Sequence, residues 1–304
     1  MKKILAIGFS QSGQLTQIVD NFLIPFNKIN AEIDRVFIEP DKPFPFPWDT
    51  KSFYDVMPET VLEEAIEIIP PKFKYNEYDL IVLGYQPWYL SPSMPTTAIL
   101  KNETFRKLLK GKPIVTIIGA RNMWLNAQES VAKLIKDAGG NLVANIPLID
   151  RTTNLISVIT IVHWMSKGKK DKKWGIFPKP GVSDEDIRKS YLFGEKVVYS
   201  FQNATYTELQ NRILQLNRIK INASILFIES RAKTLFKIWA NTIKKRGVTP
   251  KKRALWLTIF RNYLYFALFV VSPIVLTIYT LVFRPLSYKT IQRKKDNYLL
   301  NKTS

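Results

Sequence analysis

Residues 9–16 read FSQSGQLT and connect an apolar stretch, 3–9, to a segment, 16–23, with apolar residues at helical spacing. The first stretch predicts a buried parallel strand, and the second predicts a helix. Backbone N–H groups at the start of a helix have no partner inside it and point at whatever lies in front of them. Hydroxyls and one glycine fill this turn, so we predict that it holds a terminal phosphate monoester. The residues expected to form the phosphate site are Ser10, Gln11, Ser12, Gly13, Gln14 and Leu15.

Two other phosphate-binding loops do not fit this turn. The dinucleotide fingerprint needs three glycines in G-x-G-x-x-G spacing, and only Gly8 and Gly13 are present. A nucleotide P-loop needs Gly-Lys-Ser/Thr before its helix, and the chain has none. An ordinary strand-to-helix turn capped by serine remains the alternative.

Strand and helix patterns alternate through the first 150 residues. The predicted strands are 3–9, 33–39, 79–85, 113–119 and 142–149, and the predicted helices are 13–26, 58–68, 94–109 and 125–138. This alternation predicts a doubly wound five-stranded parallel sheet with helices on both faces, whose ligands bind beyond the carboxyl ends of the strands. The apolar run 155–165 is expected to pack on the sheet, a helix is expected from 184 to about 200, and the folded domain is expected to span 1–202.

The composition excludes several kinds of site. The chain has 304 residues, 46% of them hydrophobic, with no cysteine and one histidine. Disulfides, thiolate nucleophiles, iron–sulfur clusters and multi-histidine metal sites are therefore excluded, and we predict no metal. His163 lies in an apolar run, so it is either a satisfied core histidine or a proton relay.

The positive charge is concentrated near the C-terminus. Residues 1–202 hold 26 Lys and Arg against 22 Asp and Glu, whereas residues 203–304 hold 19 against 3. A basic segment of this kind suits anionic lipid or nucleic acid. No nucleic-acid-binding motif occurs, so nucleic acid is not expected as a partner.

An uncharged stretch within the basic region predicts membrane attachment. Residues 262–283 carry no formal charge over 22 positions and have cationic residues on both sides. A single span and a re-entrant hairpin broken at Ser272-Pro273 are both open, and a buried core helix or an oligomer-forming helix is the alternative. We divide the region into a basic amphipathic helical linker, 203–253, and an attachment segment with a basic tail, 254–304. In the linker, apolar residues of 232–243 share one helical face, which suits either anionic lipid or packing on the domain.

The folded domain, residues 1–202, is called the body below. It is expected at the cytoplasmic face of the inner membrane, since the apolar stretch 4–9 is too short for a signal peptide.

Two further loops are expected at the same sheet edge as the phosphate loop. The loop after the third strand is aromatic and rich in proline, and the loop after the fourth is polar with one guanidinium. A flat heterocycle on a phosphorylated chain would suit all three loops, although Trp88 and Tyr89 could instead pack on neighbouring helices. The candidate binding residues here are Gln86, Pro87, Trp88, Tyr89, Gly119, Ala120, Arg121 and Asn122.

These residues resemble known flavoproteins. The run 10–15, SQSGQL, resembles the flavodoxin phosphate loop, and Pro87-Trp88-Tyr89 resembles its second flavin loop, although flavodoxins usually have Asn-Thr where this chain has Gln14-Leu15. Over its whole length the chain resembles the flavodoxin-like dialkylresorcinol-condensing enzymes. The segments FSQSGQLTQI (9–18), YDLIVLGYQPWYLSPSMP (78–95) and WGIFPKPG (174–181) carry that resemblance.

The resemblance implies FMN as cofactor and a flavodoxin-like fold. It implies an aromatase of dialkylresorcinol biosynthesis, with a lipid-like alkylated ring as substrate and a ketosynthase as partner. Arg121 would then stabilise anionic reduced flavin, with a surface salt bridge as the alternative. His163 would relay a proton, and residues 40–48 would cover the substrate. An NAD(P)H-dependent quinone or flavin reductase and a membrane-tethered electron-transfer module are the other candidates.

Overall fold

A computed structural model describes residues 1–302 of the chain and contains one five-stranded parallel sheet, in the order β2–β1–β3–β6–β7. The strands are β1 (Lys2–Gly8), β2 (Ala31–Phe37), β3 (Leu80–Tyr85), β6 (Pro113–Ala120) and β7 (Asn141–Ile149). This order is that of the flavodoxin-like doubly wound fold, so the predicted fold class is confirmed. The direction of winding reverses between β1 and β3, and ligands bind at such switch points, beyond the strands' carboxyl ends.

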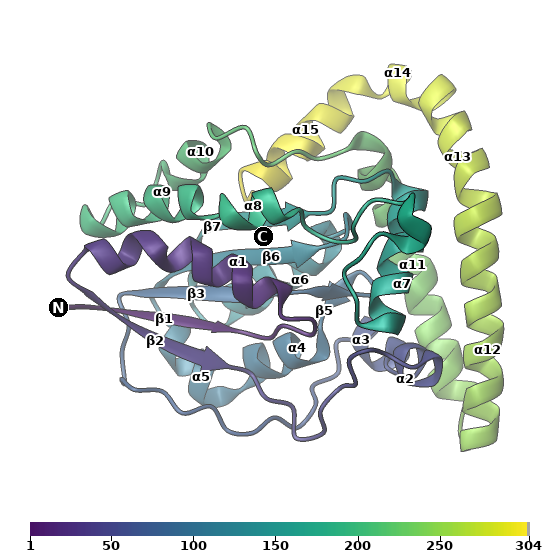
Figure 1. Cartoon of the computed structure of the whole chain (residues 1–304), viewed down its shortest axis with the longest axis horizontal. Coiled ribbons are helices and arrows are strands. Elements are labelled where there is room, and N and C mark those ends of the chain that lie inside the picture. Colours follow the sequence, from purple (N-terminus) through teal and green to yellow (C-terminus); the bar gives the residue numbers. More distant parts are fainter. Residues whose placement is uncertain (303–304) are drawn as a thin grey trace.

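Helices cover both faces of the sheet (Figure 1). In β1, Ile4 and Ala6 face one apolar cluster, and Leu5 and Ile7 face the other, because successive side chains of a strand point to opposite faces. The first cluster holds residues of α1 (Gln14–Leu23), α8 (Asp184–Arg188), α9 (Tyr191–Gln202) and α10 (Leu209–Leu214). The second holds residues of α4 (Met94–Lys101), α5 (Glu103–Leu109) and α6 (Leu125–Asp137). Residues beyond 202, such as Ile213 and Leu226, also belong to these clusters.

The helix expected over 58–68 is wrong in extent. Only α3 (Met57–Val61) forms, and Glu63 has a left-handed φ of 54°. Beyond it the chain is extended, since Asp41 N donates to Glu67 O and Ile69 N donates to Glu39 O. Backbone pairing with a distant loop overrides local helix propensity here. A short helix that the sequence pattern missed, α2 (Thr50–Asp55), begins where Asp49 accepts from Ser52 N.

Three other predicted helices are interrupted. The helix expected over 94–109 ends at Asn102, whose side chain accepts from Phe105 N and so caps α5. The one over 184–200 divides into α8 and α9. The first helix ends at Leu23, and the 3₁₀ turn η1 (Ile24–Lys28) contains the proline that follows.

The run 155–165 does not pack on the sheet as expected. It forms α7 (Asn154–Lys167), none of whose residues belongs to either apolar cluster packed on the sheet among the described residues. Helix α7 is followed by a 3₁₀ turn, η2 (Lys173–Gly175), and faces the loops at the strands' carboxyl ends. A two-stranded hairpin, β4 (Pro87–Trp88) and β5 (Ser91–Pro92), lies in the loop after β3.

The C-terminal region forms long helices. Helix α11 (Ala223–Arg246) precedes one continuous helix, Pro250–Leu286, here called the apolar helix. Its segments are α12 (Pro250–Phe266), the π-helical turns η3 (Ala267–Val271) and η4 (Tyr279–Phe283), α13 (Ser272–Ile278) and α14 (Arg284–Leu286). Helix α15 (Tyr288–Leu299) then turns back toward the sheet (Figure 1).

The apolar helix has the length and composition to cross a membrane. Its most apolar 18-residue window has a mean hydropathy of 2.3, and 6% of that window is buried. Within the described residues it is therefore not a buried core helix, whereas the alternative of an oligomer-forming helix stays open. No hairpin forms at Ser272-Pro273, because the proline occupies the first turn of α13 after a π-helical turn and the helix continues through it. The amphipathic face of α11 packs on the body, where Ala240 and Ile243 are buried.

Candidate functional site

A cavity of about 300 Å³ lies at the carboxyl ends of β1, β3 and β6, beside the β1/β3 switch point. This volume is at the lower end of the range for small-molecule sites. The loops after those strands, the segment 48–56, helix α7 and Tyr265 of the apolar helix line it. The predicted residues among its walls are Gln11, Ser12, Gln14, Gln86, Pro87, Trp88, Tyr89, Gly119, Ala120 and Arg121. Three loops far apart in sequence thus meet as predicted.

The first loop, residues 10–14, forms a cup at the start of α1. The Ser10 hydroxyl oxygen accepts from Leu15 N at 3.2 Å and from Thr16 N at 3.4 Å. Among the described residues, the N–H groups of Ser12 and Gly13 find no acceptor. Gly13 has a φ of 78°, and a Cβ placed there would meet nothing within 4 Å. The cup is therefore open, with backbone donors at a helix N-terminus, as an anion site requires.

Two glutamines of this loop, which also line the cavity, hold it in position through hydrogen bonds. The Gln14 side chain donates to Val182 O at 3.2 Å and accepts from Val182 N at 3.0 Å. Gln11 N donates to Gln86 Oε1 at 2.9 Å, and Gln11 Nε2 donates to Pro45 O at 2.7 Å. The Leu15 side chain lies in the core. These contacts connect the cup to the loop after β3, to the proline-rich loop and to the segment before α8.

The aromatic residues of the second loop have different surroundings. Trp88 makes edge contacts with Phe9, Phe44 and Trp48 at ring-centroid distances of 5.8, 5.1 and 5.5 Å. Tyr89 donates its hydroxyl to Phe53 O at 2.6 Å. The buried Trp48 Nε1 has no hydrogen-bond partner among the described residues, and Trp48 lines the cavity. An unpaired buried donor beside a cavity is a group that a ligand acceptor would satisfy.

Arg121, in the third loop, brings a positive charge to the cavity wall and has no carboxylate partner among the described residues. Its Nη1 donates to Asn154 Oδ1 at 2.8 Å and to Ser157 Oγ at 3.0 Å, and both acceptors are neutral. Burial lowers the pKa of Arg121 to about 10, although the charges of Asp150 and Glu229 act in the opposite direction. The guanidinium therefore stays protonated at neutral pH and is suited to an anionic group. The surface-salt-bridge alternative for this residue does not describe its surroundings.

The neighbours of Arg121 are held by buried polar contacts. Asn122 does not line the cavity, and its Nδ2 donates to Asn154 Oδ1 at 3.0 Å. Behind the loop, Glu229 Oε1 accepts from Asn126 N at 2.9 Å at the start of α6. Glu229 Oε2 has no partner among the described residues, and burial raises the pKa of Glu229 to about 8.

His163 is not among the residues that line the cavity in the described part of the chain. Its Nε2 lies 2.8 Å from Asp171 Oδ1, and its side chain is 20% exposed. This arrangement is neither a buried core position nor a place in the cavity. Of the loop 40–48, which is expected to cover the substrate, Trp48 is the residue among those described that lines the cavity.

Sequence reasoning missed four parts of the cavity wall. They are the segment 49–56 around α2, the second half of α7, Gly181 and Tyr265. The residues are Asp49, Thr50, Phe53, Tyr54, Val56, Ile161, Val162, Trp164, Met165, Ser166, Gly181 and Tyr265. Only Gly181 had a signal, because it ends the WGIFPKPG segment.

No protein-family model matches the chain, and no curated protein matches it. Solved flavoproteins resemble part of it. The flavoprotein of Lactobacillus acidophilus, solved with FMN, is 17% identical over 48% of this chain and 93% of its own, with a TM-score of 0.38. Flavodoxin 1 of Bacillus cereus is 15% identical over 65% and 98%, with a TM-score of 0.36. A flavone reductase is 11% identical over 66% and 64%, with a TM-score of 0.38.

Proposed function

We propose that this protein is a membrane-attached, FMN-dependent oxidoreductase that aromatises an alkylated cyclohexanedione to a dialkylresorcinol. The observation that carries the proposal is the open cup at 10–14, with unpaired backbone donors and no side chain filling it, at the edge of a cavity that also contains the Arg121 guanidinium. The phosphate of FMN would lie in the cup, and its ring system in the cavity.

The described residues fit this cofactor in three respects. The cup is built for a terminal phosphate, as backbone N–H groups at a helix start favour anions. Trp48 Nε1 is a buried donor without a partner, and a carbonyl-bearing heterocycle would satisfy it. The cavity walls are largely aromatic and aliphatic, as is usual for sites that bind flat rings.

When bound, FMN supplies two-electron oxidation by accepting a hydride from a ring carbon of the substrate. Loss of one proton from the adjacent carbon and enolisation of the two ketones complete the aromatic ring. Arg121 would place a fixed positive charge beside the negative charge that develops in the cavity, and because it is already held by Asn154 and Ser157 it needs no rearrangement. Trp48 and α7 would exclude water.

The apolar helix supports a lipid-like substrate. Tyr265 belongs to that helix and also lines the cavity, so the segment suited to a membrane borders the place where chemistry would occur. Alkyl chains partition into a bilayer, and a cavity beside the bilayer would receive the ring while the chains stay in apolar surroundings. Anionic membrane lipids and a ketosynthase that supplies the cyclohexanedione are the proposed partners, at the cytoplasmic face of the inner membrane.

Anaerobic reduction of the FMN-loaded, detergent-purified protein tests the proposal. We expect the flavin absorbance to bleach with an alkylcyclohexanedione and to remain with NADPH alone. Bleaching by NADPH alone would identify a quinone or flavin reductase instead. A flavin inert to both would indicate an electron-transfer module, and protein that takes up no FMN on titration would remove the redox assignment.

A further inference from the structure

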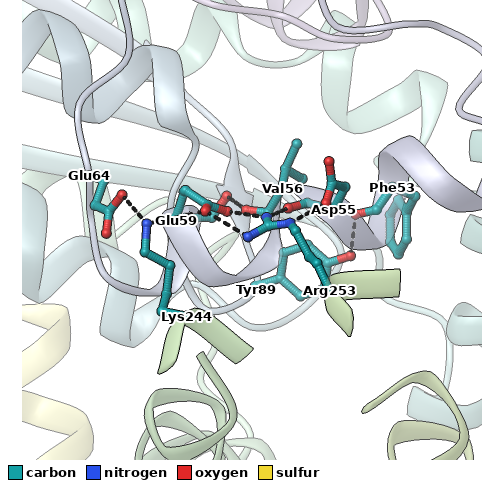
Figure 2. Close-up of polar contacts among 9 residues, drawn as sticks. Phe53, Asp55, Val56, Glu59, Glu64, Tyr89, Lys244 and Arg253 are labelled. Carbon is teal, nitrogen blue, oxygen red and sulfur yellow. Dashed lines mark hydrogen bonds and ion pairs between the residues drawn. The ribbon is translucent and has the colours of Figure 1, made fainter. Parts of the chain in front are cut away.

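Ion pairs connect the start of the apolar helix to the segment 55–64 of the body (Figure 2). Arg253 Nη2 lies 2.8 Å from Glu59 Oε2, and Arg253 Nε lies 2.5 Å from Asp55 Oδ1. Lys244, near the end of α11, lies 3.0 Å from Glu64 Oε2 and 3.3 Å from Glu59 Oε1. Acids of the body thus hold the cations that precede the uncharged stretch.

The apolar helix also contacts α11 at two places. Phe260 is buried, with its ring centroid 5.7 Å from those of Phe236 and Trp239. Two turns before the helix ends, Tyr279 is 4% exposed and stacks on Phe227 of α11 at 3.9 Å. The helix therefore packs on protein near Phe260 and again at Tyr279.

The segment after the apolar helix returns to the same body. In α15, the Tyr298 hydroxyl donates to Glu129 Oε1 at 2.5 Å. Gln210 Nε2 donates to Leu299 O at 2.7 Å, and the Leu299 side chain packs against both clusters that cover the sheet. Figure 1 shows α15 folding back from α14 toward the sheet. Both ends of the apolar helix are thus attached to one folded unit.

The opposite face of the helix is apolar and uncovered among the described residues. Its exposed side chains include Phe266, Phe269, Ile274, Ile278 and Leu281, the last of which is 73% exposed. Residues 230–295 contain no Asp or Glu, and exposed lysines and arginines lie on both sides of the uncharged stretch. An apolar surface with cationic borders is complementary to a bilayer that contains anionic lipid.

A straight span would conflict with these contacts. Crossing a hydrocarbon core of about 30 Å would put the two ends of the helix on opposite sides of the membrane. The helix has 37 residues, and the chain on both sides of it packs on the same body. To span, it would have to leave that body and expose Phe260, Tyr279 and their partners.

We infer that the apolar helix lies in the plane of one leaflet, with one face on the body and the other in anionic lipid, so that α15 stays on the same side of the membrane as the sheet. This inference rests on the membrane attachment in the proposed function and does not depend on its flavin chemistry. The proposed partner of the apolar helix is thus a lipid surface, and the helix would not join a pore or a bundle of membrane-spanning helices.

Single-cysteine labelling tests this topology, because the chain has no native cysteine. The variants are Lys252→Cys before the uncharged stretch, Lys294→Cys after it, and Lys169→Cys in the body as the control, all at exposed positions. The full-length variants are expressed in bacterial cells and treated with a membrane-impermeant maleimide, in spheroplasts and in inverted vesicles. We expect all three to be labelled in inverted vesicles and none in intact spheroplasts.

A fourth variant, Ile274→Cys carrying an environment-sensitive fluorophore, measures lipid contact. We expect its emission to shift to the blue on addition of vesicles containing phosphatidylglycerol, with no shift for the Lys169→Cys control. Labelling of Lys294→Cys only in spheroplasts would show a span and overturn the inference. Protein that stays soluble without detergent, with the Ile274→Cys fluorophore shielded before vesicles are added, would show that a second copy or another protein covers this face. Neither measurement requires bound FMN, so its failure is separate from failure of the proposed chemistry.

Discussion

Tyr265 of the apolar helix and Arg121 of the loop after β6 line the same cavity, although they lie in distant parts of the chain. The sheet edge supplies a positive charge to the cavity, and the C-terminal extension supplies part of its wall. A reaction in this cavity would therefore depend on the extension as well as on the α/β body. The variants that follow separate the contributions of the cup, the charge and the extension.

Gly13→Leu should weaken FMN binding by about 100-fold or more, because it disturbs the left-handed turn and fills the phosphate cup. Gly111→Leu is a matched control, since Gly111 also has a positive φ, of 71°, and open space at its Cβ. Titration of the apoprotein, followed by flavin fluorescence, measures both affinities. Full flavin content in Gly13→Leu would mean that the phosphate lies elsewhere.

Arg121→Met should slow reduction of the bound flavin by substrate by about 100-fold, because a preorganised charge is lost where negative charge develops. Arg121→Lys should recover part of the rate, and FMN content and thermal stability should be checked for each variant. His163→Gln is the companion variant, and its expected rate is that of the unmodified protein, since His163 pairs with Asp171 away from the cavity. Stopped-flow absorbance distinguishes these outcomes. Slow reduction of the flavin in His163→Gln would instead support His163 as a proton relay.

Glu229→Gln should change the pH dependence of stability. Burial raises the pKa of Glu229 in the folded state to about 8 from an ordinary value of 4.5. Between these two pKa values the folded state binds one proton more than the unfolded state. The resulting stabilisation of the folded state is complete below about pH 4.5 and is lost as the pH rises through about 8. The free energy of unfolding relative to Glu229→Gln should fall by roughly 4 kcal/mol across this window.

Denaturant unfolding at pH 5 and pH 9, followed by tryptophan fluorescence, measures that difference. Glu195→Gln, at an exposed position of α9, serves as the control. A constant difference between the unmodified protein and Glu229→Gln at both pH values would contradict a buried, protonated carboxyl.

Tyr265→Trp should raise KM for an alkylcyclohexanedione by about 10-fold while FMN affinity is retained, because a larger ring narrows the wall supplied by the apolar helix. Phe266→Trp places the same ring on the next residue, which is exposed on the outer face. Steady-state kinetics in detergent compare the two. Equal KM values would argue that substrate does not pass Tyr265.

The sheet and the three loops after β1, β3 and β6 could be predicted from the sequence because local patterns determine them. The alternation in β1 assigns Leu5 and Ile7 to one face and Ile4 and Ala6 to the other, and each loop follows directly from its strand. The end of α3 could not be predicted, because it depends on backbone pairing of Glu67 and Ile69 with the distant 39–41 segment. The same holds for α7, whose uninterrupted apolar run is typical of a core helix but faces a cavity instead.

The part of the site supplied by the extension had no sequence signal. Tyr265 lies in a run of aromatic and aliphatic residues in which each position is equally suited to lipid. Tertiary contacts, among them the packing of Phe260 on Tyr54 and the ion pairs of Arg253, determine which side of the helix faces the rest of the protein. Likewise, the pairing of Gln14 with Val182 depends on a contact between distant segments.

The docking of Leu299 against the sheet-covering clusters has a consequence for the order of folding. These clusters include Ile4 and Leu5 of β1, so the contact closes a loop that contains most of the described chain. Contacts between segments far apart in sequence form late, because the entropy of loop closure has to be overcome first. The apolar helix lies inside this loop, so the chain after it becomes fixed only when α15 docks.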